Sequence, residues 1–216
     1  MGAGNDEEPF ESIYARAGAN LDSIPWAGLA PNPALVEWLA SQPGRGEGGG
    51  SDRGRGAPAL VVACGLGDDA EDLARRGYAV TAFDVSPTAI EKCHERFPAS
   101  TVEYLVADVF DLPDGWTESY ALVVEIRTLQ SLPPDVRGQA ARAIAATVAP
   151  GGQLFVRTAV REPDEPLGNR PWPLIASELN AFIDAGLTER EAREDPPGPH
   201  RFRMFTGVYQ RAPGPI

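Results

Sequence analysis

The fold is indicated by the stretch Leu60-Val-Val-Ala-Cys-Gly-Leu-Gly-Asp-Asp-Ala70 of this 216-residue chain. It overlaps a continuous apolar run, residues 59–64, of the kind that forms a strand buried on both faces of a parallel sheet. The glycines lead into a helix predicted for residues 69–76, which Gly77 ends. A strand, a glycine turn and a helix in this order are the context that a nucleotide cofactor requires.

The same alternation repeats along the chain. The sequence predicts a second strand at 79–83 that ends at Asp84, followed by a helix for which Ser86 is the N-cap and Pro87 the first residue. Further strands are predicted at 102–106, 120–125 and 153–158, and a helix at 135–148. Alternating strands and helices indicate a parallel, doubly wound sheet.

The C-terminal part departs from this rhythm. Ser177 is expected to cap a helix that runs to Ala185, and strands follow at 187–193 and 202–210. Only a Pro- and Gly-rich loop joins the two strands, so they must pair antiparallel. The predicted fold class is therefore α/β, a doubly wound, mostly parallel seven-stranded sheet with an antiparallel C-terminal hairpin.

The N-terminal part precedes this pattern. Short helices are predicted at 9–17 and 33–40, with Asn32 as an N-cap. Residues 42–57 are rich in glycine and carry no large apolar side chain, which predicts a flexible loop. We expect one domain over 1–216, in which 1–41 form a helical cap, 42–57 the loop and 58–216 the core.

Composition limits the classes of partner. Lys and Arg number 19 against 31 Asp and Glu, and the net charge of −12 disfavours nucleic acid and anionic membrane surfaces. The sequence has no apolar run long enough for a membrane span and no basic leader, so we expect a cytoplasmic protein. Its two cysteines, Cys64 and Cys93, indicate neither a disulfide framework nor a metal cluster. A small-molecule partner is the better expectation.

The glycine pattern Gly65-Leu-Gly67-Asp-Asp-Ala70 fits either a dinucleotide or S-adenosylmethionine (SAM). Asp68 and Asp69 lie in the first helical turn, where a pyrophosphate would bind and where they would repel it. SAM carries no phosphate and has a positive sulfonium. Asp84, at the end of the second strand, is placed to accept both ribose hydroxyls, a position that NAD sites share.

Residues 60–67 and 77–90 resemble the first two motifs of class I SAM-dependent methyltransferases. Residues 106–111 resemble the third motif, 120–130 the fourth and 150–156 the turn into strand five. The family's usual acidic residue in the first motif is Val61 here, and its usual first glycine is Ala63. Short motifs around Trp26 and Trp172 resemble the thiopurine and tellurite methyltransferase branch.

The resemblance implies SAM as cofactor and S-adenosylhomocysteine as product, in the class I methyltransferase fold. Asp84 would hold the ribose, and Asp108 the adenine amino group, with Asp111 as an alternative. Trp26 would face the sulfonium or, alternatively, pack the N-terminal helices on the sheet. The full implied cofactor set is Trp26, Ala63, Cys64, Gly65, Gly67, Asp84, Val85, Asp108, Val109, Glu125, Ile126 and Arg127.

The expected reaction is methyl transfer to a small molecule by direct in-line displacement, without a catalytic side chain or a metal. No pattern of His and Asp or of paired carboxylates indicates a general base, which a hydroxyl acceptor would need. We therefore favour a thiol or another soft nucleophile, such as a heavier chalcogen. The expected substrate contacts are Tyr14, Arg127, Arg170 and Trp172. O- or N-methylation and a non-catalytic cofactor-binding protein are the alternatives, and the oligomeric state stays open.

Overall fold

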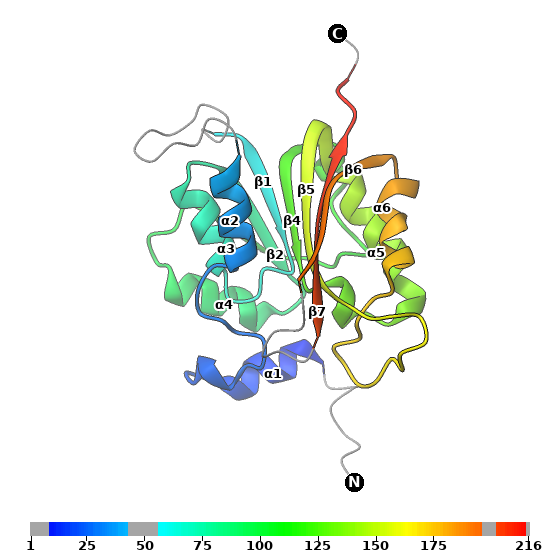
Figure 1. Cartoon of the computed structure of the whole chain (residues 1–216). Coiled ribbons are helices and arrows are strands. Elements are labelled where there is room, and N and C mark those ends of the chain that lie inside the picture. Colours follow the sequence, from blue (N-terminus) through cyan, green and yellow to red (C-terminus); the bar gives the residue numbers. More distant parts are fainter. Residues whose placement is uncertain (1–8, 43–55, 196–201, 215–216) are drawn as a thin grey trace. The chain divides into compact units, whose positions relative to one another are not determined.

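The computed structural model describes residues 9–42, 56–195 and 202–214 (Figure 1). Most of the predicted Gly-rich loop lies outside these residues. The chain divides into two compact units, one spanning Glu8–Asp108 and the other containing Val109–Ile216. Each unit is described separately below.

The unit Glu8–Asp108 is built on three parallel strands. β1 (Pro58–Val62) pairs with β2 (Ala79–Asp84), and β2 pairs with β3 (Glu103–Val106). After their first residues, β1 and β2 are buried throughout, as the apolar runs predict. Two helices connect these strands, α3 (Asp68–Arg75) and α4 (Pro87–Arg96).

Two further helices precede this sheet, α1 (Phe10–Ala17) and α2 (Pro33–Ser41). The predicted helix starts are confirmed where a side chain caps the backbone. Asn32 accepts a hydrogen bond from the Ala34 N–H, and Ser86 accepts one from the Ala89 N–H. The ends are confirmed too, since Gly77 follows α3 with a φ of 94°.

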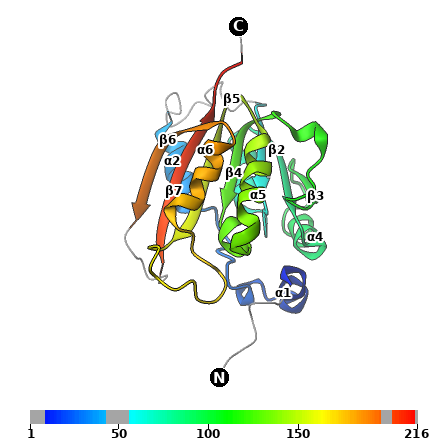
Figure 2. The same ribbon diagram turned by 90° about the vertical axis from the view of Figure 1, so that its right-hand side faces the viewer.

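The unit containing Val109–Ile216 has parallel and antiparallel pairing. β4 (Tyr120–Ile126) runs parallel to β5 (Val148–Val160), and β7 (Arg203–Arg211) is antiparallel to β5. β6 (Leu187–Asp195) pairs antiparallel with β7. Figure 2 shows α5 (Pro134–Ala146) and α6 (Asn180–Asp184) on the same face of these strands. The predicted C-terminal hairpin is therefore present.

Two local predictions need correction. The Pro150-Gly-Gly turn does not precede strand five but lies inside it, as an irregularity in the pairing with β4, because β5 already starts at Val148. Ser177 is not a helix cap. The helical segment starts earlier, with η4 (Ala176–Leu179), and the Glu178 carboxylate accepts the Ile175 N–H at 2.8 Å.

The strand order is β3-β2-β1-β4-β5-β7-β6 in a seven-stranded sheet. Of the strand pairs described above, β1–β2, β2–β3 and β4–β5 are parallel, and the two that involve β7 are antiparallel. The predicted fold class, a mostly parallel seven-stranded α/β sheet with an antiparallel C-terminal hairpin, is confirmed.

Candidate functional site

The turn between β1 and α3 depends on backbone conformations that favour glycine. Gly65 has a φ of 55° and Gly67 a φ of 85°, and the Gly67 N–H donates to the Cys64 carbonyl at 3.0 Å. A Cβ atom on Gly67 would lie 2.5 Å from the Tyr104 hydroxyl oxygen and 3.1 Å from the Cys93 sulfur. Residue 67 must therefore be glycine for both conformational and steric reasons.

Ala63 occupies the place of the family's usual first glycine, and its φ is 46°. A left-handed conformation costs a residue with a Cβ roughly 1–2 kcal/mol. The turn keeps its shape despite this substitution. Ala63 is therefore a strained position in this turn.

Asp84 ends β2 directly beside this turn. Its side chain is buried, and its two oxygens accept the backbone N–H groups of Gly65 (2.9 Å) and Ser86 (3.0 Å). Burial raises the pKa of Asp84, although the backbone hydrogen bonds oppose this shift. A carboxylate offers about four lone-pair sites, and the backbones of Gly65, Ser86 and Val85 take up about three of them. This carboxylate therefore keeps capacity for about one further donor.

The two aspartates that open α3 have structural partners. Arg96 forms a two-pronged ion pair with Asp68, at 2.7 and 2.9 Å, and Asp69 accepts the Asn32 N–H at 2.6 Å. The Asp68 charge is thus neutralised from α4. The repulsion of a pyrophosphate that the sequence suggests is correspondingly weaker, and the preference for SAM has to rest on other observations.

Helix α1 is fastened to the start of α4. The Glu11 carboxylate accepts hydrogen bonds from the Ser86 hydroxyl at 2.5 Å, from the Thr88 N–H at 3.2 Å and from the Thr88 hydroxyl. At the other end of α1, the Lys92 ammonium donates to the Gly18 carbonyl. Because Ser86 lies two residues after Asp84, this attachment holds α1 close to the end of β2.

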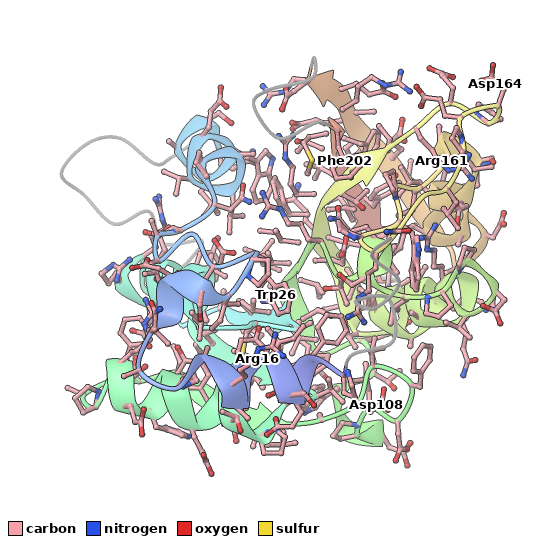
Figure 3. The ribbon with its side chains drawn as sticks, turned by 90° about the horizontal axis from the view of Figure 1, so that it is seen from below. Arg16, Trp26, Asp108, Arg161, Asp164 and Phe202 are labelled. Atoms are coloured by element: carbon pink, nitrogen blue, oxygen red, sulfur yellow. The ribbon has the colours of Figure 1, made fainter. Side chains whose placement is uncertain are left out.

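Tyr14 of α1 and Trp26 form part of a buried aromatic cluster beside the glycine turn. The Trp26 indole donates to the Tyr14 hydroxyl at 2.9 Å, and its ring meets the edges of Tyr14 and Phe10. The Tyr14 hydroxyl lies 3.1 Å from the position of a Cβ on Gly65. Burial, together with the charge of Asp84, raises the pKa of Tyr14. Figure 3 shows Trp26 next to α1.

Trp26 packs against Phe10 and Tyr14 of α1, and its ring is partly exposed. The Tyr14 hydroxyl oxygen accepts a hydrogen bond from the Trp26 indole, so the Tyr14 O–H is still able to donate to another group. Of the two aromatic residues, Tyr14 is the one whose polar atom reaches the glycine turn.

The segment after β3 continues along β2. The Ala107 N–H donates to the Asp84 carbonyl at 3.1 Å, which places exposed Asp108 next to the end of β2 (Figure 3). Val85 is 51% exposed despite its apolar side chain, and Val106 is 53% exposed. Two exposed apolar side chains and a carboxylate thus follow or end the neighbouring strands β2 and β3.

The second unit holds the remaining predicted residues. Glu125, at the end of β4, is fully buried, and its Oε1 accepts the N–H groups of Thr128 (2.6 Å) and Leu129 (3.1 Å). Its Oε2 has no hydrogen-bond partner in the described structure, and burial raises the pKa of Glu125 to about 7. One oxygen of the Glu125 side chain therefore organises the turn after β4, and the other is left without a partner in the described structure.

The other predicted site residues of this unit are buried or partly buried. Ile126 and Arg127 are partly buried, and Arg127 has a φ of 65°. Val109, at the start of this unit, is buried. Arg170 and Trp172, in the segment that follows β5, are both partly buried. The described geometry thus groups Tyr14, Trp26, Cys64, Gly65, Gly67, Asp84, Val85 and Asp108 in one unit, and Val109, Glu125, Ile126, Arg127, Arg170 and Trp172 in the other.

Residues that the sequence analysis did not single out also shape these sites. Cys93 lies under the glycine turn and donates to the Gly65 carbonyl at 3.3 Å. Glu11 fastens α1, and Gln130 and Arg137 bind the backbone of Trp172. Their partners lie 28 to 75 residues away along the chain, so no local pattern marks them.

In the ranges 9–42, 56–195 and 202–214, no group of three or more His, Cys, Asp or Glu side chains is placed to hold a metal ion. No helix in that part of the chain is long and apolar enough to cross a bilayer.

Comparison with known proteins connects this geometry to a family. Residues 59–152 match the family described as a methyltransferase domain. The ubiquinone biosynthesis O-methyltransferase of Pseudomonas savastanoi pv. phaseolicola is 31% identical over 134 residues, which cover 61% of this chain and 53% of the relative. The chain spans about half the length of the curated relatives it matches.

Solved structures share the fold over most of the chain. The N-methyltransferase NodS from Bradyrhizobium japonicum WM9, in complex with S-adenosylhomocysteine, has a TM-score of 0.70 at 21% identity and covers 94% of this chain and 99% of its own. A structure titled for the conversion of a disulfide bond into a thioacetal group during echinomycin biosynthesis has a TM-score of 0.66 at 25% identity, with 87% and 84% covered. Residues 59–152 thus match the methyltransferase domain, and the fold is that of class I methyltransferases.

Proposed function

We propose that this protein is a SAM-dependent methyltransferase that acts on a small molecule. The observation that carries the proposal is the buried Asp84 carboxylate, which ends β2 and is held beside the glycine turn by the N–H groups of Gly65 and Ser86. An acidic side chain at the end of the second strand is placed to accept hydrogen bonds from a ribose. The match of residues 59–152 to the methyltransferase domain supports the same cofactor.

The residues of the unit Glu8–Asp108 fit the rest of SAM. Gly65 and Gly67 have no side chain and hold left-handed conformations, so their backbone can contact the methionine part directly. Exposed Val85 and Val106 offer apolar contact to the adenine, and Asp108 offers an acceptor for its amino group. The relatives' complexes with S-adenosylhomocysteine support this assignment.

SAM supplies an electrophilic methyl group when it is bound. The acceptor's lone pair forms the new bond to the methyl carbon while the bond from that carbon to the sulfonium sulfur breaks. The protein's contribution is to hold the acceptor in line with that carbon and to exclude water. No covalent bond to the protein is needed, and we assign no catalytic side chain.

We further propose a thiol as the acceptor, probed first with small thiols. Glu125 is 0% exposed and one of its oxygens holds the turn after β4, and His94 is an exposed residue of α4, so we assign neither of these two side chains as a general base. A thiol ionises near neutral pH without one, and cationic Arg127 or Arg170 would favour the thiolate. The structure that concerns a disulfide-to-thioacetal conversion, 25% identical to this chain, supports chemistry at sulfur.

O-methylation is the second candidate, favoured by the name of the curated relatives, ubiquinone biosynthesis O-methyltransferase. It would need a base to remove the hydroxyl proton. The two candidates therefore differ in their pH dependence as well as in their product.

The test has a binding arm and a turnover arm. Isothermal titration should show binding of SAM and S-adenosylhomocysteine but not of NAD, and absence of SAM binding would overturn the cofactor proposal. The protein is then incubated with SAM and matched pairs of acceptors, such as 4-nitrothiophenol and 4-nitrophenol, with mass spectrometry of the products. Methyl thioether formation supports the thiol, and methyl transfer confined to the phenol rejects it in favour of O-methylation.

A further inference from the structure

Helix α1 carries one carboxylate, Glu11, which is bound by the first residues of α4. Its oxygens accept hydrogen bonds from the Ser86 hydroxyl at 2.5 Å, from the Thr88 N–H at 3.2 Å and from the Thr88 hydroxyl. The Ser86 hydroxyl accepts the Ala89 N–H at 3.0 Å, so its single proton is available for Glu11. The dipole of α4 also favours a carboxylate beside its N-terminus. Glu11 thus fastens α1 to α4 by three hydrogen bonds.

Helix α1 depends on such contacts because it is too short to be stable alone. It has eight residues, and isolated helices shorter than about 12–15 residues are marginal in water. No side chain caps its start at Pro9. Its buried side packs in an apolar cluster, where Tyr14 of α1 meets Leu66 of the glycine turn and Ala89 of α4. The place of α1 is therefore set by this packing together with its polar attachments.

The backbone of Gly65 is contacted on three sides. Its N–H donates to the Asp84 carboxylate at 2.9 Å, and its carbonyl accepts the Cys93 thiol at 3.3 Å. On the third side lies the Tyr14 hydroxyl, 3.1 Å from the position of an added Cβ and held there by the Trp26 indole. Asp84 ends β2 and Cys93 belongs to α4, so Tyr14 is the contact that α1 supplies.

These contacts close into a ring that starts and ends on α1. The Ser86 hydroxyl binds Glu11, while the Ser86 N–H binds one oxygen of Asp84 at 3.0 Å. The other oxygen of Asp84 binds Gly65, and Gly65 meets Tyr14. Glu11 and Tyr14 are three residues apart on α1 and so lie on the same side of the helix. All members of the ring belong to one compact unit.

We infer that Glu11 is a positioning residue of the cofactor site, which holds α1 on α4, sets Tyr14 against Gly65 and so strengthens cofactor binding. This inference rests on the proposed function, which assigns Gly65 and Asp84 to SAM. Glu11 acts through Tyr14 and does not touch the cofactor. A turn that is already held in its bound shape loses less freedom on binding, so the ligand binds more tightly. Because such coupling is reciprocal, a bound cofactor should also hold α1 more firmly.

The first experiment compares Glu11→Gln with Glu91→Gln, the same change at an exposed position of α4. In E11Q, the affinity for S-adenosylhomocysteine, measured by isothermal titration, should fall about fivefold or more, since only molecules with α1 attached bind at full strength. In E91Q it should stay within about twofold of the parent's. Equal affinity in E11Q and the parent, or an equal loss in E91Q, overturns the inference. If E11Q does not fold, Thr88→Val replaces it, because valine lacks only the hydroxyl that binds Glu11.

A double-mutant cycle with Tyr14→Phe separates the route through Tyr14 from the route through Ser86 and Asp84. Phenylalanine keeps the ring but lacks the hydroxyl that meets Gly65. In Y14F, the further change Glu11→Gln should have little effect on the affinity for S-adenosylhomocysteine, because the contact that Glu11 positions is already missing. Losses that multiply in the double variant overturn the inference, since Glu11 would then act independently of Tyr14.

Hydrogen exchange tests the reciprocal effect, which a merely structural role of Glu11 would not produce. In the parent, bound S-adenosylhomocysteine should raise the protection of the α1 amides, residues 10–17, against local opening. If the protein binds S-adenosylhomocysteine and these amides gain no protection, the inference is overturned.

A readout without ligand distinguishes failure of this inference from failure of the proposed function. In protein labelled with 5-fluorotryptophan, the Trp26 signal is assigned by its loss in Trp26→Phe. Glu11→Gln should shift or broaden that ¹⁹F signal, because the Trp26 indole donates to Tyr14, while the Trp116 signal stays. An unchanged Trp26 signal overturns the inference. A changed Trp26 signal in a protein that binds no S-adenosylhomocysteine supports the positioning of Tyr14 and rejects the proposed function alone.

Discussion

The Tyr14 hydroxyl lies directly against the backbone of Gly65, 3.1 Å from where a Cβ atom would be. The contact joins α1 to the turn that follows β1, and the same hydroxyl is held in place by the Trp26 indole. It means that residue 65 has little room on the side of α1. The glycine is needed for this close approach as well as for its φ of 55°.

Gly65→Ala should weaken cofactor binding without unfolding the protein. The left-handed conformation costs an alanine roughly 1–2 kcal/mol, and the new methyl group presses on Tyr14. We expect the melting temperature to fall by a few degrees and the affinity for S-adenosylhomocysteine to fall about tenfold, measured by scanning calorimetry and titration. Gly115→Ala is the control, since no atom lies within 4 Å of its added Cβ. Equal affinity in parent and G65A would contradict the assignment of this turn.

Asp84→Asn should weaken cofactor binding through the ribose. Hydrogen bonds to a charged acceptor contribute about 1.5–3 kcal/mol each, so the affinity for S-adenosylhomocysteine should fall about 10- to 100-fold. The 2′-deoxy analogue provides the matched comparison, because the parent should discriminate against it more strongly than D84N does. If both proteins discriminate equally, Asp84 does not bind the ribose.

The elements that local patterns specify agree closely with the structure. Apolar runs place β1 and β2, and the Asn32 and Ser86 caps place the starts of α2 and α4, because each depends on residues adjacent in sequence. β5 differs because its first residues, around Pro150 and Gly151, pair across an irregularity that only the neighbouring strand reveals. The spacing of apolar residues and the residues typical of turns identify these strands, but they do not determine where each strand begins and ends.

The site shows the same division between local and distant interactions. The glycine turn and Asp84 can be identified from the sequence because they lie at the ends of strands with a recognisable apolar composition. The neutralisation of Asp68 by Arg96, and the capping of α4 by Glu11, depend on side chains 28 and 75 residues away. The repulsion of a pyrophosphate expected from Asp68 is weaker for this reason, and the choice of SAM is kept on other observations.

Glu11 should make the attachment of α1 depend on pH. Its hydrogen bonds from Ser86 and Thr88 hold the pKa of Glu11 below its usual 4.5. The attachment is therefore complete above the unfolded-state pKa and is lost as the pH falls through the lower folded-state value. Hydrogen exchange of residues 10–17 should show protection that declines below about pH 4.5. Glu11→Gln should remove most of this dependence, and Glu91→Gln, at an exposed position of α4, should not. An identical pH profile in E11Q would reject the role of this carboxylate.

Glu125 should lower stability as the pH rises, the reverse of a typical surface carboxylate. Burial raises its pKa from 4.5 to about 7, so between these values the folded state holds a proton that the unfolded state has released. The free energy of unfolding should therefore fall from about pH 4.5 to pH 7 and then level off, with a loss on the order of 3 kcal/mol.

Glu125→Gln isolates this effect, because a glutamine oxygen still accepts the N–H groups of Thr128 and Leu129 but does not titrate. The difference in unfolding free energy between parent and E125Q, from urea denaturation at several pH values, should shift in favour of E125Q as the pH rises. Glu95→Gln, at an exposed position of α4, should give a nearly constant difference. A constant difference for E125Q as well would show that Glu125 ionises normally. In that case the turn after β4 would be held by an ordinary carboxylate, and its order would not change between pH 5 and 8.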